Sequence, residues 1–181
     1  VANALIHQDF SIRGTGPMVE IFLNRMEITN PGLPLVNADR FIDSPPKSRN
    51  ESLASLMRRV GICEERGSGF DKVVALTEFY QLPPPIIEVT KEHTKVILFS
   101  YLDFKDMSKE DKIRACYLHC CLKYVNREYM TNTSLRERFG LDTKDARMIS
   151  RLLKDTINME LVKLLDSETN SRYYKYLPFW A

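Results

Sequence analysis

The sequence lacks any long apolar run, any secretory signal and any strong excess of one charge. A helix that crosses a membrane needs roughly 18 consecutive apolar residues, and no stretch approaches that length. We therefore expect a cytoplasmic protein without a membrane partner. The net charge of +2 is too small to identify a nucleic-acid-binding protein by itself. The sequence also has no P-loop, which argues against a helicase.

Paired zinc ligands are missing as well. The cysteines are Cys63, Cys116, Cys120 and Cys121, and the last three fall on one predicted helix. They form no CxxC pair and no pair of histidines follows them, so the spacing argues against a zinc site. Their apolar surroundings indicate reduced thiols that pack in a core, as in a reducing compartment.

The length of 181 residues suits two small domains, and we place them at residues 1–105 and 106–181. The first carries 12 basic and 13 acidic side chains, and the second carries 14 and 11. This modest basic bias of the second domain is compatible with phosphate contacts but is not diagnostic. Val1 opens directly into a helical pattern without a capping residue, so we expect the chain to continue a longer polypeptide.

Hydrophobic periodicity predicts a mixed α/β structure for the first domain. Residues 1–7 have the pattern of the end of a helix, and apolar residues alternate over 19–23 and 26–29, as in an antiparallel hairpin. After a loop-rich stretch, Asn50 is placed to cap a helix that Gly61 ends. The remaining predicted elements are a helix over residues 70–79 and a strand pair over 86–89 and 96–101.

The second domain has a different pattern, in which helices come first and strands last. The predicted helices cover residues 109–125, 132–139 and 144–157. Apolar and aromatic residues over 162–165 and 173–179 then flank a turn at 167–171. Helix, helix, helix and hairpin is the order of a winged helix. The fold class is therefore α+β, an α/β domain followed by a winged helix-turn-helix domain.

A helix-turn-helix is also indicated by local features of this domain. Thr133–Leu141 has the character of a short capped helix that turns at Gly140, where the turn needs the conformational freedom of glycine. Asp142 or Thr143 is placed to cap the helix that follows.

That following helix carries cations on the face opposite its apolar residues, and such a stripe is able to enter a major groove. Two further cations flank the predicted wing. The residues we expect to contact DNA are Lys144, Arg147, Ser150, Arg151, Lys154, Arg172 and Lys175. The competing interpretation is a solvated helix face whose cations pair with Asp145 and Asp155.

Five segments of the first domain follow one another in a familiar order. They read NALIHQDF over 3–10, VEIF over 19–22, EITNPG over 27–32, SRN over 48–50 and ERGSG over 65–69. This order resembles the RecG-like, Schlafen/AlbA-associated family of transcription regulators, in which the corresponding text is NALxHRDY, VEIF, IxNPGGLP, RNP and ERGSG. The match covers about residues 1–80.

The family's domain is similar to the GHKL ATPases in divergent form, which implies ATP with Mg²⁺ as a cofactor. The resemblance makes Asn3 the magnesium-facing residue and places His7 one turn further along the same helix. Asn30–Gly32 takes the place of the first glycine box, and Gly67–Gly69 that of the second. The nucleotide-binding residues implied in this way are Asn3, His7, Asn30, Gly32, Gly67, Ser68 and Gly69.

The sequence departs from the GHKL pattern at several positions. The acidic base of an active enzyme precedes the asparagine by about one helical turn and is not in this sequence, so we expect no catalytic residue and no hydrolysis here. Asn30 replaces the aspartate that reads adenine, while Gln8 and Phe10 replace an arginine and a tyrosine. A structural interpretation of His7, as a cation at a helix C-terminus, stays open.

Three hypotheses follow. In the first, the protein is a regulator that binds double-stranded DNA through the second domain. Its first domain senses a nucleotide or another ligand, and the protein forms a homodimer that binds a two-fold site. In the second, the first domain is an ATPase that drives a conformational cycle. The third is a protein-interaction scaffold without DNA binding, which requires Lys144, Arg147 and Arg151 to be paired or buried.

Overall fold

The computed structural model describes residues 1–45, 47–63, 69–166, 168 and 170–181. The chain divides into two compact units. The first contains Val1–Val73 and Pro85–Ser100, and the second contains Val74–Pro84 and Tyr101–Ala181. The sequence-based division at residue 105 differs from this one because the segment Val74–Pro84 packs with the C-terminal unit. None of the described helices is long and apolar enough to cross a membrane.

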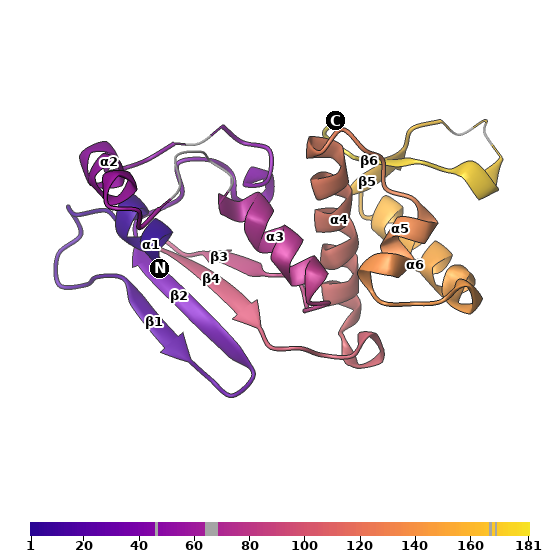
Figure 1. Cartoon of the computed structure of the whole chain (residues 1–181), viewed down its shortest axis with the longest axis horizontal. Helices are drawn as coiled ribbons and strands as arrows, with labels where there is room; N and C mark the ends of the chain where they lie inside the picture. Colours follow the sequence, from indigo (N-terminus) through magenta and orange to yellow (C-terminus); the bar gives the residue numbers. More distant parts are fainter. Residues whose placement is uncertain (46, 64–68, 167, 169) are drawn as a thin grey trace. The chain divides into compact units, whose positions relative to one another are not determined.

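The first unit is organised around an antiparallel sheet (Figure 1). Its strands are β1 Met18–Ile21, β2 Arg25–Pro31, β3 Ile86–Val89 and β4 His93–Phe99, in the order β1-β2-β4-β3. Both predicted strand pairs are confirmed, with Val19 opposite Ile28 and Ile87 opposite Val96. The pairing of β2 with β4 joins the two hairpins, and this long-range contact has no signature in the local sequence.

Successive residues of each strand point to opposite faces of the sheet. Glu27 lies opposite the buried Ile97 of β4, and its carboxylate accepts hydrogen bonds from Arg25, at 2.7 Å, and from Lys95. These bonds hold the pKa of Glu27 below its usual value, with the Lys95 bond as the larger cause. Ile28 and its β4 neighbour Val96 lie on the other face.

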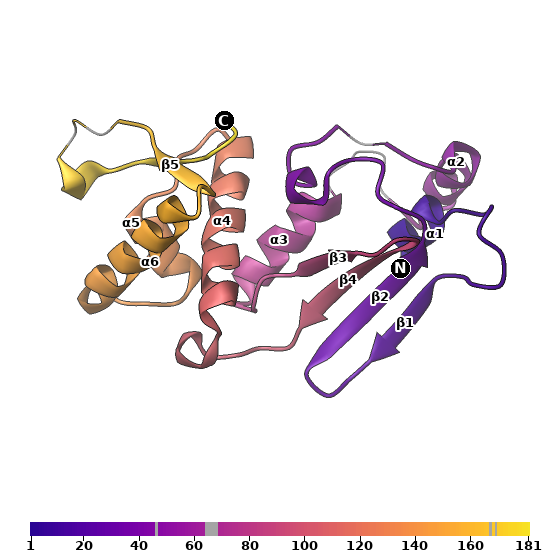
Figure 2. The same cartoon turned by 180° about the vertical axis from the view of Figure 1, so that it is seen from behind.

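Helix α1, Ala2–His7, packs against β2 and against α2, Glu51–Arg59. Ile6, Ala54 and Met57 form a small apolar cluster between the two helices. The two helices lie together beside one end of the sheet, as both views show (Figures 1 and 2). Gly61 follows α2 with φ +73°, which agrees with the predicted helix end.

The predicted capping role of Asn50 is wrong in its chemistry. Asn50 stands at the N-cap position of α2, but its side chain makes no capping hydrogen bond. Its amide instead donates to the backbone oxygens of Ile6, at 2.8 Å, and Gln8, at 2.9 Å. The end of α1 leaves carbonyl groups unpaired, and Asn50 satisfies them and thereby fixes α2 to α1.

The second unit has the element order that the sequence predicts. Its main elements are α4 Lys109–Val125, α5 Asn132–Arg138, α6 Ala146–Asn158, β5 Val162–Leu164 and β6 Tyr176–Pro178. The short 3-10 helices η2 Phe104–Asp106, η3 Thr143–Asp145 and η4 Ser171–Tyr173 lie between them. The expectation of a strand from residue 173 onward is wrong, because Tyr173 ends η4 and β6 starts at Tyr176.

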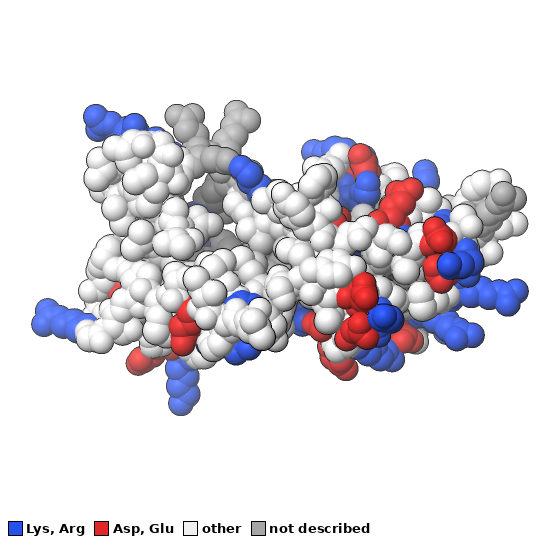
Figure 3. Space-filling view, turned by 60° about the horizontal axis from the view of Figure 1, so that its bottom comes forward, with Lys and Arg blue, Asp and Glu red and all other residues white. Residues whose placement is uncertain are grey.

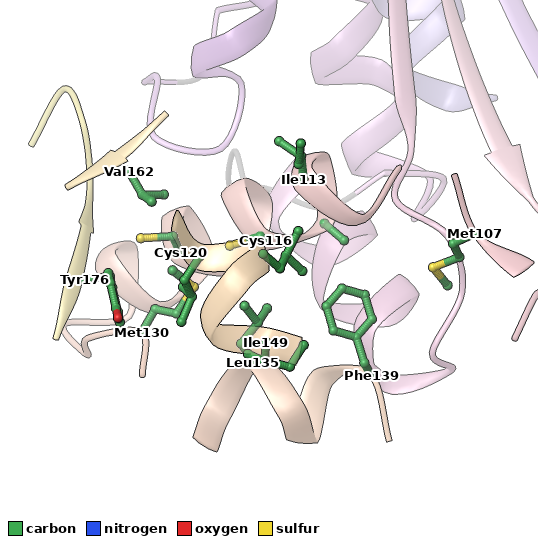
Figure 4. Packing of buried hydrophobic residues seen from close by; sticks show 13 residues of the cluster. Met107, Ile113, Cys116, Cys120, Met130, Leu135, Phe139, Ile149, Val162 and Tyr176 are labelled. Atoms are coloured by element: carbon green, nitrogen blue, oxygen red, sulfur yellow. The ribbon is translucent and has the colours of Figure 1, made fainter. Parts of the chain in front are cut away.

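A single apolar core holds these elements together (Figure 4). Cys116 and Cys120 of α4 meet Leu135 of α5 and Ile149 of α6 there, and Val162 closes the core from β5. Burial raises the pKa of the Cys116 thiol to about 12 and also raises the pKa of Cys120. Cys116 and Cys120 are thus packing residues in the protonated form.

Helix α3, Gly69–Phe79, is continuous across the division between the units. Its first residues, through Val73, belong to the first unit, and Val74 and the residues that follow belong to the second. It matches the predicted helix over 70–79. In the first unit Phe70 packs edge-to-face on Phe41, with ring centroids 5.8 Å apart.

Candidate functional sites

The loop after β2 is built tightly around Gly32. Gly32 has φ +108°, its N–H donates to the Glu92 oxygen at 2.6 Å, and its own oxygen accepts from the Thr94 hydroxyl at 2.7 Å. A Cβ added to Gly32 would lie 2.9 Å from the Cβ of Asp9. Neighbouring Asn30 is buried, and its amide donates to the Pro31 oxygen at 3.4 Å. Both the backbone angle and the space therefore require glycine here.

Arg49 ties this loop to the end of α1. Its guanidinium donates to the His7 oxygen at 3.2 Å, to the Leu33 oxygen at 2.7 Å and to the Asp9 carboxylate at 3.3 Å. The pKa of His7 is lowered by burial and, to a smaller extent, by the positive charge of Arg49. His7 therefore favours the neutral imidazole, which weakens its interpretation as a cation at the helix C-terminus.

Asn3 meets the start of α3. Asn3 is exposed on α1, and a Cβ added to Gly69 would lie 3.0 Å from its Nδ2 atom. Gly69 is the first residue of α3, so the N-terminal backbone of this helix adjoins the asparagine. Gly67 and Ser68 lie outside the described residues.

A depression with a volume of about 500 Å³ lies next to Arg49. It is lined by Phe10 and by residues 48–53, that is, by the loop before α2 and its first turn. Asn3, Asn30, Gly32 and Gly69 do not line it, so it does not include the nucleotide-binding residues that the family resemblance implies.

In the second unit the predicted cations are exposed. Lys144 on η3 and Arg147, Arg151 and Lys154 on α6 are all exposed, opposite the buried residues of α6 such as Ile149. Lys144 lies 3.5 Å from Asp142. Among the described residues, Arg147, Arg151 and Lys154 make no ion pair. Figure 3 shows Lys and Arg side chains projecting from the second unit, on the right, among Asp and Glu side chains.

The acidic residues that would neutralise this face have other partners. The Asp155 carboxylate pairs with Lys109 of α4 at 2.9 Å. The Asp145 carboxylate accepts a hydrogen bond from the Asp142 N–H at 3.2 Å. The pairing that the solvated-face interpretation expects is therefore not formed in the described part of the chain.

Helices α5 and α6 are fixed to each other by hydrogen bonds. The Asn132 amide donates to the Ala146 oxygen at 3.0 Å and to the Ser150 hydroxyl at 3.1 Å, and Arg136 donates to the Asn132 oxygen at 3.0 Å. The Ser150 hydroxyl also donates to the Ala146 oxygen at 2.9 Å, so Ser150 is exposed but its hydroxyl is already hydrogen-bonded within the unit. Gly140, with φ +64°, makes the turn between the helices.

The hairpin β5–β6 is antiparallel, with Lys163 opposite Leu177. Lys175 precedes β6 and is exposed, and its Nζ lies 5.2 Å from the centroid of the Tyr129 ring. Arg172 lies in η4, and its side chain is outside the described part of the structure. Tyr176 also forms a bridge with Met130, ahead of α5.

Sequence reasoning missed a buried polar cluster in the second unit. The His119 Nδ1 lies 2.9 Å from the Glu78 carboxylate, and its Nε2 lies 3.1 Å from the Ser134 hydroxyl. Arg138, also buried, donates to the Leu82 oxygen at 2.7 Å. A histidine within a cysteine-rich apolar helix was the available signal, but its partners are remote in sequence.

Comparison with known proteins bears on the first unit. Residues 14–98 match the family model described as "Putative ATP-dependent DNA helicase recG C-terminal". We therefore call this part of the chain the RecG-like domain. The match begins after α1 and ends in β4, so it contains Asn30, Gly32 and Gly69 but not Asn3 or His7.

No curated protein matches the chain. Among solved structures, the crystal structure of the DIP2311 protein from Corynebacterium diphtheriae is similar, with 12% sequence identity and a TM-score of 0.48. That alignment covers 97% of this chain and 48% of the DIP2311 chain, so the present chain spans about half the length of that protein.

Asn3 is the residue that the family resemblance implies for Mg²⁺, and its surroundings determine what it is able to bind. The described residues form no cluster of three or more His, Cys, Asp and Glu side chains suited to a metal. Mg²⁺ usually keeps several waters and takes its other ligands from one or two protein oxygens and from substrate phosphates. Asn3 is exposed next to the first residue of α3, and its side chain offers one amide oxygen of this kind.

Proposed function

We propose that the protein is a transcription regulator that binds double-stranded DNA through residues 106–181 and a nucleotide of the ATP class through its RecG-like domain. The observation that carries the DNA-binding part is the exposed basic face of α6, where Arg147 and Arg151 have no ion pair among the described residues. A helix in the major groove presents such a face to phosphates and base edges.

The surrounding elements suit the same role. A winged helix presents its third helix to the major groove and its hairpin to the neighbouring backbone. Here α6 is the third helix, held to α5 by Asn132, and Lys175 stands at the hairpin. Arginine is the side chain best suited to bidentate contact with guanine, whereas Lys144 and Lys154 at the ends of the face suit phosphates. We further propose that a homodimer binds a two-fold site.

The DNA-binding proposal is tested on the full chain with a random-sequence DNA duplex over a salt series. Replacing Arg147 and Arg151 with alanine removes two phosphate or base contacts, so affinity falls roughly 100-fold at low salt. The slope of log K against log salt becomes shallower by about 2, since each phosphate contact contributes about 0.9.

The matched control is R58A/R59A at the end of α2, which changes the net charge by the same amount in the other unit. Its affinity and slope are expected to stay near those of the unaltered chain. Equal losses in both double variants would mean that only overall charge matters, and no DNA binding at low salt would favour a protein-interaction scaffold.

Nucleotide binding is supported by the family match over residues 14–98 and by the contact between Asn3 and the first residue of α3. The N-terminal amides of a helix favour phosphate, and Asn3 adds a ligand for the metal bound to that phosphate. Bound Mg²⁺ would neutralise phosphate charge. We expect a fluorescent ATP analogue to bind the full chain in the presence of Mg²⁺ and to bind N3A at least tenfold more weakly. Equal binding with N3A would remove Asn3 from the site.

A further inference from the structure

Helix α3 has chemically distinct neighbours at its two ends. At its first residue, Gly69 adjoins the Asn3 amide. Near its last turn, Glu78 is bonded to His119 of α4, and the Leu82 carbonyl just after the helix accepts from Arg138 of α5. One continuous helix therefore connects the residue that adjoins the proposed nucleotide site with residues of the helix-turn-helix.

The contact at Glu78 reaches the first turn of α5. His119 is buried, with 4% of its surface exposed, and both ring nitrogens are engaged, one by Glu78 and the other by Ser134. Ser134 forms the capping box of α5, since its hydroxyl accepts from the Thr131 N–H at 3.0 Å and its own N–H donates to the Thr131 hydroxyl at 3.1 Å. His119 thus contacts Ser134, the residue that completes the capping box of α5.

From α5 the chain of hydrogen bonds continues to the basic helix. Asn132, in the same first turn, donates to the Ala146 oxygen and the Ser150 hydroxyl of α6. The path from Glu78 to α6 consists of short polar contacts on packed helices, so a displacement of Glu78 away from His119 is transmitted to α5 and α6, whereas an isosteric replacement that stays in place leaves their geometry unchanged.

The same cluster contains polar atoms that lack partners. The Oε1 atom of Glu78 and the Nε and Nη1 atoms of Arg138 are buried without a hydrogen-bond partner among the described residues. Unpaired buried polar groups cost free energy, and the negative charge of Glu78 acts on the Arg138 guanidinium. A small shift of α3 that brings Glu78 to Arg138 would relieve this cost while releasing His119. Glu78 therefore has two competing partners, as a two-state element requires.

We infer that α3 couples nucleotide binding to DNA binding, with Glu78 as the movable contact and His119 as the positioning residue that transmits its state to α5 and α6. This inference rests on the proposed function and names its regulation. By linkage, a nucleotide that changes DNA affinity must have its own affinity changed by DNA by the same factor.

The experiment measures DNA affinity of the full chain with and without ATP and Mg²⁺, and nucleotide affinity with and without DNA. We expect each ligand to change the dissociation constant of the other by the same factor, fivefold or more. In E78Q the factor falls to within twofold of unity, while the affinity for each ligand alone and the salt slope of DNA binding stay within twofold of those of the unaltered chain.

H119Q is the second variant, because glutamine keeps a polar group next to Ser134 but cannot bridge it to Glu78 as the imidazole does. It is expected to lose the coupling as E78Q does, and thermal unfolding checks that both variants are folded. E137Q, an exposed charge change on α5, is the matched control and keeps the full factor.

Amide hydrogen exchange gives a readout that needs no DNA. Addition of ATP and Mg²⁺ is expected to change exchange in residues 132–138 of the unaltered chain and not of E78Q. Binding of both ligands without mutual effect, or undiminished coupling in E78Q, would overturn the inference alone. Absence of either binding event in the unaltered chain would overturn the proposed function and the inference with it.

Discussion

Arginine has opposite roles in the two units. Arg49 in the first unit donates to the backbone oxygens of His7 and Leu33 and to the Asp9 carboxylate, so its hydrogen-bonding groups are used inside the chain. Arg147 and Arg151 in the second unit are exposed and have no ion pair among the described residues. The first residue maintains a loop, and the other two are available to a ligand.

The same contrast applies to the motifs around these residues. The segment with Gly32 is highly distinctive in sequence, yet the Gly32 backbone groups are hydrogen-bonded to Glu92 and Thr94, and Asp9 packs against its Cα. The α6 face has no distinctive motif, yet its Arg147, Arg151 and Lys154 make no ion pair among the described residues. The family motif around Gly32 thus serves the fold of a loop, whereas the cations that we propose for DNA binding come from a segment without such a motif.

The largest expected effect concerns Gly32 and tests whether its segment serves the fold of the loop. G32A forces a side chain into the positive-φ region, which costs roughly 1–2 kcal/mol, and places its Cβ against Asp9, with an overpacking cost of about 1–3 kcal/mol. We expect the free energy of unfolding, measured with urea, to fall by about 2–4 kcal/mol. G14A is the control, because Gly14 also has positive φ but a Cβ there meets nothing within 4 Å. Equal losses in the two variants would show that Asp9 does not crowd Gly32.

The comparison of arginines is tested directly by a pair of alanine variants. R49A leaves the partly buried His7 oxygen and Asp9 carboxylate, and the exposed Leu33 oxygen, without a charged donor, so we expect a loss of about 2 kcal/mol in the free energy of unfolding. R147A removes an exposed side chain and is expected to change that quantity by less than about 0.5 kcal/mol, while weakening DNA binding. The comparison fails if R147A destabilises the protein as much as R49A does.

The sequence predicted the elements with local signatures best. The helix predicted over 109–125 has those bounds in the structure, and the two strand pairs of the first unit were predicted, the first from alternation and the second from two apolar runs. Helical and strand periodicity depend on residues a few positions apart, so they are recognised from the sequence without knowledge of the fold. Gly140 was predicted for the same reason, since its positive φ serves a local turn.

What the sequence did not predict depends on distant partners. Asn50 belongs to a residue type that favours the N-cap position. Its amide instead donates hydrogen bonds to the carbonyls of Ile6 and Gln8, more than 40 positions away. Glu78 and His119 are 41 positions apart and meet only because Val74–Pro84 packs with the second unit. Propensity and spacing contain no information on such pairs, and tertiary packing decides them.

A smaller effect is expected at Glu27, a charge that is engaged on the sheet of the first unit. Its pKa is lowered by hydrogen bonds from Lys95 and Arg25, so the folded state binds fewer protons than the unfolded state near that pKa. Its stabilising contribution is present above the unfolded pKa and is lost as the pH falls through the lowered folded pKa.

E27Q is therefore less stable than the unaltered chain at pH 7, and the two unfolding free energies converge as the pH falls below about 4. Urea unfolding at a series of pH values measures this. E20Q, on the neighbouring strand opposite Glu27, is the control. A difference between E27Q and the unaltered chain that stays constant with pH would assign the effect to packing instead of charge.

The last comparison concerns the reactivity of the thiols in the two units, which is measured without changing the stability of the protein. Cys63 in the first unit is half-buried, whereas Cys116, Cys120 and Cys121 in the second are buried. A thiol reacts as its thiolate and must be reached by the reagent. Burial raises the pKa of Cys116 to about 12, so at pH 8 its thiolate fraction is about one in ten thousand.

Alkylation of the native protein at pH 8 should therefore modify Cys63 first, and the other thiols only at the rate of unfolding. Mass spectrometry should find one modified residue in buffer, all four in urea, and none in native C63S. Rapid labelling of α4 in buffer would mean that the core of the second unit opens readily. Because α4 packs against α5 and α6 through that core, such opening would also remove the fixed geometry on which the proposed DNA-binding face depends.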